Sequence, residues 1–163
     1  MSADLPVLVH VTVGFVLAYL LGFERELRGS SAGDRTFALI GTGSAIIGVL
    51  AENGAPNAVA GAITGIGFIG AGLMFRETIS SQRHVVRGMT SAAGIFAASA
   101  IGAAAGQGHL ALATLGTVLA LLTLELRYTP GLRALGAEYW TNRFHSEDAD
   151  PQVEDSPRVP EPR

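Results

Sequence analysis

The sequence predicts an all-α membrane protein with five transmembrane helices, and three observations support this. The first is composition: 48% of the 163 residues are apolar and only 15% are charged, whereas a soluble domain carries about 25% charged residues. The second is that the charges gather between five long apolar stretches. The third is that arginine occurs only in alternate loops. Together they indicate that lipid surrounds most of the chain.

Each apolar stretch is close to the length of a membrane span. A hydrocarbon core about 30 Å thick needs about 20 helical residues, within a range of about 17–25. The second stretch is short and must use residues at its ends or thin the bilayer locally. A soluble bundle would need a polar face along each helix, which these stretches lack. The predicted spans are residues 5–23, 36–51, 57–75, 89–105 and 109–124.

Arginine positions predict the orientation of the chain. Cytoplasmic loops of membrane proteins carry an excess of positive charge. The first loop (residues 24–35), the third loop (residues 76–88) and the C-terminal region hold all eleven arginines, and the other loops hold none. An odd number of spans follows, with the N-terminus outside and the C-terminus in the cytoplasm.

The chain divides into three predicted regions. Residues 1–126 form the transmembrane domain. Residues 127–145 form a juxtamembrane amphipathic segment, in which Leu132, Leu135 and Tyr139 share one helical face; a plain linker is the alternative. Residues 146–163 form a disordered tail, because this stretch is polar, acidic and rich in proline.

Glycine is concentrated in the third span. Lipid-embedded helices associate through close van der Waals packing, which small residues permit. We therefore expect the third and fourth spans to lie at the centre with their backbones close together. A broken third helix that lines a small cavity is an alternative. The spacing of Gly65, Gly67 and Gly70 also matches a dinucleotide fingerprint, but no strand precedes it and no acid follows at the required distance. The glycines concerned are Gly61, Gly65, Gly67, Gly70 and Gly72.

Two polar clusters lie at the predicted cytoplasmic ends of the spans, in residues 22–36 and 76–90. Glu24 and Arg28 are four residues apart and can pair if the first helix continues through them. These charges form either a solvated cap or a network in which Glu24 and Glu26 meet Arg35, Arg76 or Arg87. Carboxylates also suit magnesium, but their spacing here selects no metal.

The sequence excludes several classes of function. The spans carry no Asp, Glu, Lys or Arg deep in the membrane, which argues against a proton-coupled or divalent-cation pathway through one subunit. Cysteine is absent, so disulfides and thiolate sites are excluded. No catalytic pair, metalloprotease motif or phosphate-binding loop occurs, and no basic domain suits nucleic acid. We expect no enzyme, no cofactor and no nucleic-acid partner.

At these clusters the sequence resembles the MgtC/SapB family of bacterial inner-membrane proteins. The resemblance covers about residues 5–125 and rests on three motifs: GFERELRGSSAGDRT from Gly22, GIGFIGAGLMFR from Gly65, and VRGMTSAAGIFAASAIG from Val86. Phe23 and Phe96 depart from the commoner residues of the family. The motif positions implied as functional are Glu24, Arg25, Glu26, Arg28, Arg35, Thr36, Gly65, Gly67, Gly70, Gly72, Arg76, Arg87, Gly88 and Thr90.

The resemblance implies five spans with an outer N-terminus. It links the chain to survival in low magnesium, to intracellular growth of pathogens and to inhibition of the ATP synthase. The best-known members carry a cytoplasmic ACT-like domain after the fifth span, and about 37 residues at this position are too few for it.

From the residues and the resemblance together we expect a multi-pass protein of the bacterial inner (plasma) membrane. It would bind other membrane proteins, and further copies of itself, in magnesium or membrane-energy homeostasis. The alternative is a small oligomeric transporter or channel for magnesium or another ion.

Overall fold

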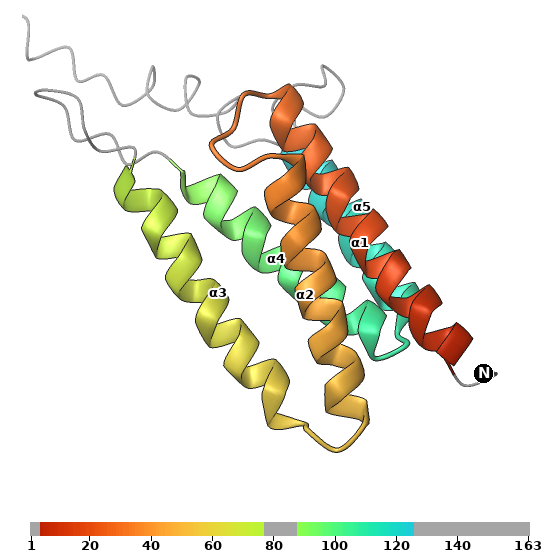
Figure 1. Ribbon diagram of the computed structural model, residues 1–163. Helices are drawn as coiled ribbons and strands as arrows, with labels where there is room; N and C mark the ends of the chain where they lie inside the picture. The colour runs from red at the N-terminus through yellow and green to blue at the C-terminus, as the bar shows by residue number, and fades with distance from the viewer. Residues whose placement is uncertain (1–3, 77–87, 126–163) are drawn as a thin grey trace, which may run out of the picture. The chain divides into compact units, whose positions relative to one another are not determined.

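Five helices make up the computed structural model, which describes residues 4–76 and 88–125 (Figure 1). All five predicted stretches are helical, and their ends differ from the predictions by a few residues at most, so the all-α prediction is confirmed. The predicted segments 127–145 and 146–163 lie outside the described residues. The helices are α1 (Asp4–Leu27), α2 (Asp34–Glu52), α3 (Asn57–Arg76), α4 (Met89–Gly106) and α5 (Leu110–Glu125).

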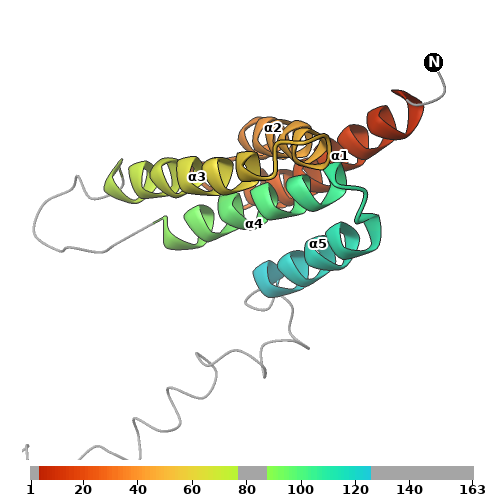
Figure 2. The same cartoon turned by 90° about the horizontal axis from the view of Figure 1, so that it is seen from below.

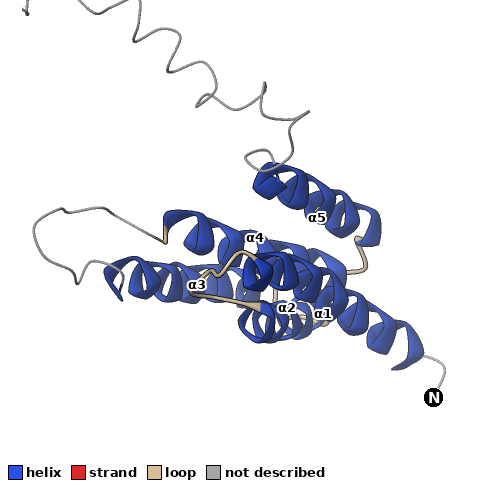
Figure 3. Ribbon diagram, turned by 90° about the horizontal axis from the view of Figure 1, so that it is seen from above, coloured by secondary structure: helices blue, strands red, loops and turns tan. Residues whose placement is uncertain are grey.

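Helices α1 to α4 are long and apolar enough to cross a membrane. Helix α5 is equally apolar but has 16 residues in the part of the chain that is described. Four of the five expected spans therefore have the length that a bilayer requires. Figure 3 shows that helices and their connecting loops account for all the described residues.

Helix α1 ends in a Schellman motif, which reverses the chain. Gly29 adopts a φ of 66°, a left-handed conformation that glycine reaches without steric cost. Its N–H donates to the carbonyl oxygen of Glu26 at 3.0 Å, and the N–H of Ser30 donates to that of Arg25 at 3.0 Å. The chain then enters α2 beside the end of α1.

Small residues hold α1 against α2. Gly14, Ala18 and Gly22 recur every four residues of α1 and so share one face. A Cβ built on Gly22 would lie 2.6 Å from the Cβ of Phe37, and one built on Gly14 would lie 2.8 Å from that of Ala45. Real Cβ atoms do not approach so closely, so larger residues at these positions would force the helices apart.

Helix α4 packs against α2 in the same manner. A Cβ on Gly102 would lie 2.5 Å from the carbonyl oxygen of Gly41. A Cβ on Gly106 would overlap the carbonyl oxygen of Ala45, and one on Gly48 would overlap that of Ala103. Half of the α4 span is buried within the bundle, and Figure 2 shows α4 between α5 on one side and α2 and α3 on the other. Helix α4 is thus central.

The expectation that α3 shares this central place is wrong. Only 6% of its span is buried. Of the five glycines singled out in the sequence, only Gly70 meets another helix, where its Cβ position lies 3.5 Å from the Cβ of Ala92. The open positions are Gly61, Gly65, Gly67 and Gly72, whose Cβ sites meet nothing within 4 Å. Helix α3 is also continuous, so the broken-helix alternative is not observed.

Candidate functional site

Glu24 anchors a charged cluster at the end of α1. Only 8% of this residue is exposed. The Nε of Arg28 donates a hydrogen bond to Glu24 Oε1 at 3.3 Å, and Arg25 Nη1 lies 3.5 Å from Oε2. The pair expected at four-residue spacing is therefore present, and a second guanidinium joins it. A buried carboxylate needs such compensation, since burial of a lone charge is strongly unfavourable.

Arg25 links this cluster to the loop that follows α1. Its Nη2 donates to the hydroxyl of Ser30, so one side chain bridges Glu24 and the loop. Two buried atoms in the cluster, Glu24 Oε2 and Arg25 Nε, have no hydrogen-bond partner among the described groups. An unsatisfied buried donor or acceptor costs roughly 1–3 kcal/mol. These two atoms can therefore accept or donate a further hydrogen bond that the described side chains do not supply.

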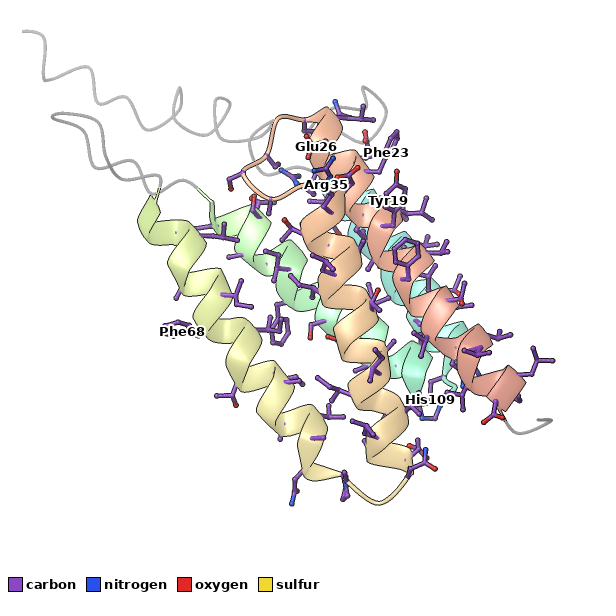
Figure 4. All side chains as sticks on the ribbon, in the orientation of Figure 1. Tyr19, Phe23, Glu26, Arg35, Phe68 and His109 are labelled. Carbon is purple, nitrogen blue, oxygen red and sulfur yellow. The ribbon has the colours of Figure 1, made fainter. Side chains whose placement is uncertain are left out.

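Glu26 lies at the start of α2 rather than in the Glu24 cluster. Its carboxylate lies where a Cβ on Gly33 would stand, and Gly33 is the N-cap residue immediately before α2, which has no side-chain cap. Asp34 Oδ1 accepts from the N–H of Arg35 at 2.6 Å. Two carboxylates thus face the positive end of the α2 dipole, which negative charge stabilises. Figure 4 shows Glu26 and Arg35 at this end of the bundle.

The other predicted site residues occupy three kinds of position. Arg35 is exposed and Thr36 is half-buried in the first turn of α2. Gly88 precedes α4 with a φ of 91°, and Thr90 is exposed in its first turn. Arg76 ends α3, and Arg87 lies outside the described residues. The structure therefore assembles Glu24, Arg25, Glu26 and Arg28 beside the start of α2, while Gly65, Gly67 and Gly72 lie apart on α3.

Sequence reasoning missed Phe37, the residue that joins three helices at this end. It is fully buried. Its Cβ meets Gly22 of α1, and its ring lies 3.1 Å from the Cβ position of Gly94 on α4. The signal for it was the Gly14–Ala18–Gly22 spacing in α1, which marks a face that accepts a close neighbour.

Charged groups of both signs gather at this end of α1. Carboxylates and guanidinium groups are equal in number over residues 24–35. Within residues 4–76 and 88–125, no three histidine or acidic side chains gather closely enough to hold a metal ion. The arrangement links the end of α1 to the loop that leads into α2.

Comparison with known proteins identifies the family of the chain. A model of the MgtC family matches residues 11–129. The chain belongs to the MgtC family. With four helices long enough to cross a bilayer, it is a multi-pass membrane protein of that family. No solved structure matches the chain.

Several known proteins are similar in sequence to this MgtC-family chain. "Putative magnesium transporter YhiD" of Escherichia coli (strain K12) is 32% identical over 145 residues, which cover 81% of this chain and 65% of YhiD. Protein SrpB of Synechococcus elongatus is 36% identical over 130 residues, covering 71% of each chain. Protein MgtC of Brucella abortus (strain 2308) is 38% identical over 109 residues, covering 64% of this chain and 44% of that protein. The match thus spans less than two thirds of YhiD and less than half of the Brucella protein.

Proposed function

We propose that this protein acts by binding other membrane proteins in the bacterial inner membrane, in the setting of magnesium or membrane-energy homeostasis. The observation that carries the proposal is the open glycine face of α3. Gly61, Gly65 and Gly72 share one side of that helix with Phe68, and all three glycines meet nothing within 4 Å.

This face has the properties of a helix-binding surface. In lipid, helices associate where small side chains let two backbones approach. Phe68, 84% exposed, projects from the same face and points away from the other helices in Figure 4. A second transmembrane helix can pack its backbone close to these glycines and contact the exposed Phe68 side chain. That helix comes either from another protein or from a second copy of this chain.

The distribution of charge favours binding over coupled transport. The middles of all five described helices lack Asp, Glu, Lys and Arg, whereas ion and proton pathways keep such residues inside the membrane. Most of the charged groups of the described helices instead gather at the end of the bundle where α1 leads into α2. The magnesium setting is supported by the name of YhiD, "Putative magnesium transporter", and by membership of the MgtC family.

The proposed orientation puts the arginine-rich loops and the C-terminus in the cytoplasm and the N-terminus outside. A reporter fused after residue 54 should therefore be on the opposite side of the bilayer from one fused after residue 145. Finding both on the same side would contradict this topology.

A pull-down tests the binding role. Tagged protein is solubilised in mild detergent, and co-purifying proteins, including a differently tagged copy of the chain, are identified by mass spectrometry. Gly65→Leu should lose a specific membrane partner, because its side chain fills the glycine face without touching the rest of the bundle. Gly43→Leu is the matched control, since Gly43 of α2 also meets nothing within 4 Å. A partner set identical in both variants would count against the α3 face.

The competing function is a small oligomeric transporter or channel, which the name of YhiD raises. Purified protein in liposomes separates the two functions. Magnesium flux above that of empty vesicles, lost in a Glu24→Ala variant that still reconstitutes as a folded protein, would defeat the binding role. Flux equal to that of empty vesicles supports it.

A further inference from the structure

Helices α1, α2 and α4 are interlocked by contacts that resist separation. At Gly22, Gly41 and Gly102 a Cβ would collide with the neighbouring helix, so the backbones are already as close as they can be. The hydroxyls of Ser44 and Ser99 also share a buried hydrogen bond between α2 and α4. In lipid, close packing and interhelical hydrogen bonds are the forces that hold helices together. These three helices therefore form a rigid unit.

Helix α3 is attached in a different way. Of its glycines, only Gly70 meets another helix, and its 3.5 Å approach to Ala92 is an ordinary van der Waals distance. The hydroxyl of Thr64 bonds to the carbonyl oxygen of Ala60 in its own helix. Only 6% of the span is buried, against 50% for α4. Separating α3 from the unit therefore breaks much less packing than separating α4.

The connection between α2 and α3 has the features of a hinge. Gly54 adopts a φ of 101°, and nothing lies within 4 Å of its Cβ position. Rotation at this residue therefore displaces no packed side chain and breaks one hydrogen bond of the turn, from the N–H of Ala55 to the carbonyl oxygen of Leu50 at 3.1 Å. The surrounding residues, Glu52 to Asn57, are all exposed. In Figure 1, α2 and α3 diverge from this turn toward the opposite end of the bundle. Such short, unpacked segments absorb the backbone change in hinged motions.

We infer that α3 is a hinged arm, which pivots at Gly54 and swings away from a rigid unit formed by α1, α2 and α4. In the closed position Gly70 contacts Ala92, as described. In the open position the α4 surface around Ala92 faces the bilayer. The motion is a property of the isolated chain, so it does not depend on the binding role proposed above.

Spin labels in lipid nanodiscs test this arm, and the cysteine-free chain gives a clean background for labelling. One label is placed on α1 at Leu20→Cys, which is exposed. The second is placed on α3, either far from the hinge at Gly72→Cys or near it at Gly61→Cys, both in open space. The control pair joins Leu20→Cys to Leu50→Cys on α2, also exposed. Pulsed electron resonance on frozen samples then gives the distribution of each distance.

The Leu20–Gly72 pair should show a second, longer distance, because both positions of the arm are trapped on freezing. The Leu20–Gly61 distribution should be narrower, since this site is near the pivot, and the Leu20–Leu50 pair should give one narrow peak. A single narrow peak for Leu20–Gly72 would overturn the inference. Equal broadening at Gly61 and Gly72 would overturn it too, because that pattern means that α3 moves as a whole without a hinge.

Discussion

Ser44 of α2 and Ser99 of α4 share a hydrogen bond of 2.8 Å across 55 positions of sequence. Both residues are buried. Removing either hydroxyl leaves the other without this interhelical hydrogen bond. We expect Ser44→Ala and Ser99→Ala each to lower the free energy of unfolding in detergent by about 0.6–1.7 kcal/mol, the range for such bonds between membrane helices.

The double variant identifies the bond as the cause. Ser44→Ala combined with Ser99→Ala should lose less stability than the sum of the single losses, because the second substitution removes a hydroxyl that is already unpaired. Thr64→Ala is the control, since Thr64 bonds only within its own helix. Strictly additive losses would show that the two hydroxyls act independently.

The glycines of α1, α2 and α4 should differ sharply from open glycines in their tolerance of a methyl group. Gly41→Ala would place its Cβ on that of Ala18, and overpacking of this kind costs about 1–3 kcal/mol. Gly43→Ala, two positions along the same helix, meets nothing within 4 Å and should be neutral or slightly stabilising, because alanine favours helix more than glycine does. Thermal melting in detergent measures both. Equal melting temperatures would contradict the close α1–α2 contact.

The buried carboxylate of Glu24 should matter more to folding than an exposed acid. Glu24→Ala leaves the guanidinium of Arg25, 11% exposed, without its anionic partner, and we expect a loss on the order of 3 kcal/mol. Glu52→Ala changes the same residue type at an exposed helix end and serves as the control. Size-exclusion profiles and melting curves give the comparison. A Glu24→Ala variant as stable as Glu52→Ala would show that the cluster is a solvated cap.

A disulfide should form between α3 and α4 in the closed position. The Cβ position of Gly70 lies 3.5 Å from the Cβ of Ala92, within the usual separation of about 3.5–4.5 Å in disulfides. The Gly70→Cys/Ala92→Cys protein should therefore lose its free thiols on mild oxidation, as counted by a maleimide mass tag. The Gly65→Cys/Ala92→Cys protein should keep them within one chain, because Gly65 is on the open face. Retention of thiols in the first pair would contradict the α3 position.

The helices and the Glu24–Arg28 pair were predictable because both depend on short-range pattern. An apolar run bounded by charges, as in residues 5–23, determines where a span begins and ends. A four-residue spacing brings two side chains together once the helix is known. Neither inference needs knowledge of which helices are neighbours.

The position of α3 was not predictable, because the number of glycines in a helix does not show which helix packs against them. Gly61, Gly65 and Gly72 permit a close neighbour but do not specify whether it comes from this chain. The less conspicuous series Gly14, Ala18 and Gly22 makes the internal contact, since Phe37, Gly41 and Ala45 on α2 have matching shape. Such complementarity appears only when two helices are placed together. The functional roles expected of Arg76 and Arg87 stay predictions.

The Schellman turn at Gly29 has a consequence for biogenesis. It brings α1 and α2 face to face within one continuous stretch of chain, so this hairpin can assemble in the bilayer while later segments are still on the ribosome. Helix α4 packs directly on this hairpin, whereas α3, although synthesised earlier than α4, lies at its margin. The order of the helices along the chain therefore differs from the order of their packing around the hairpin.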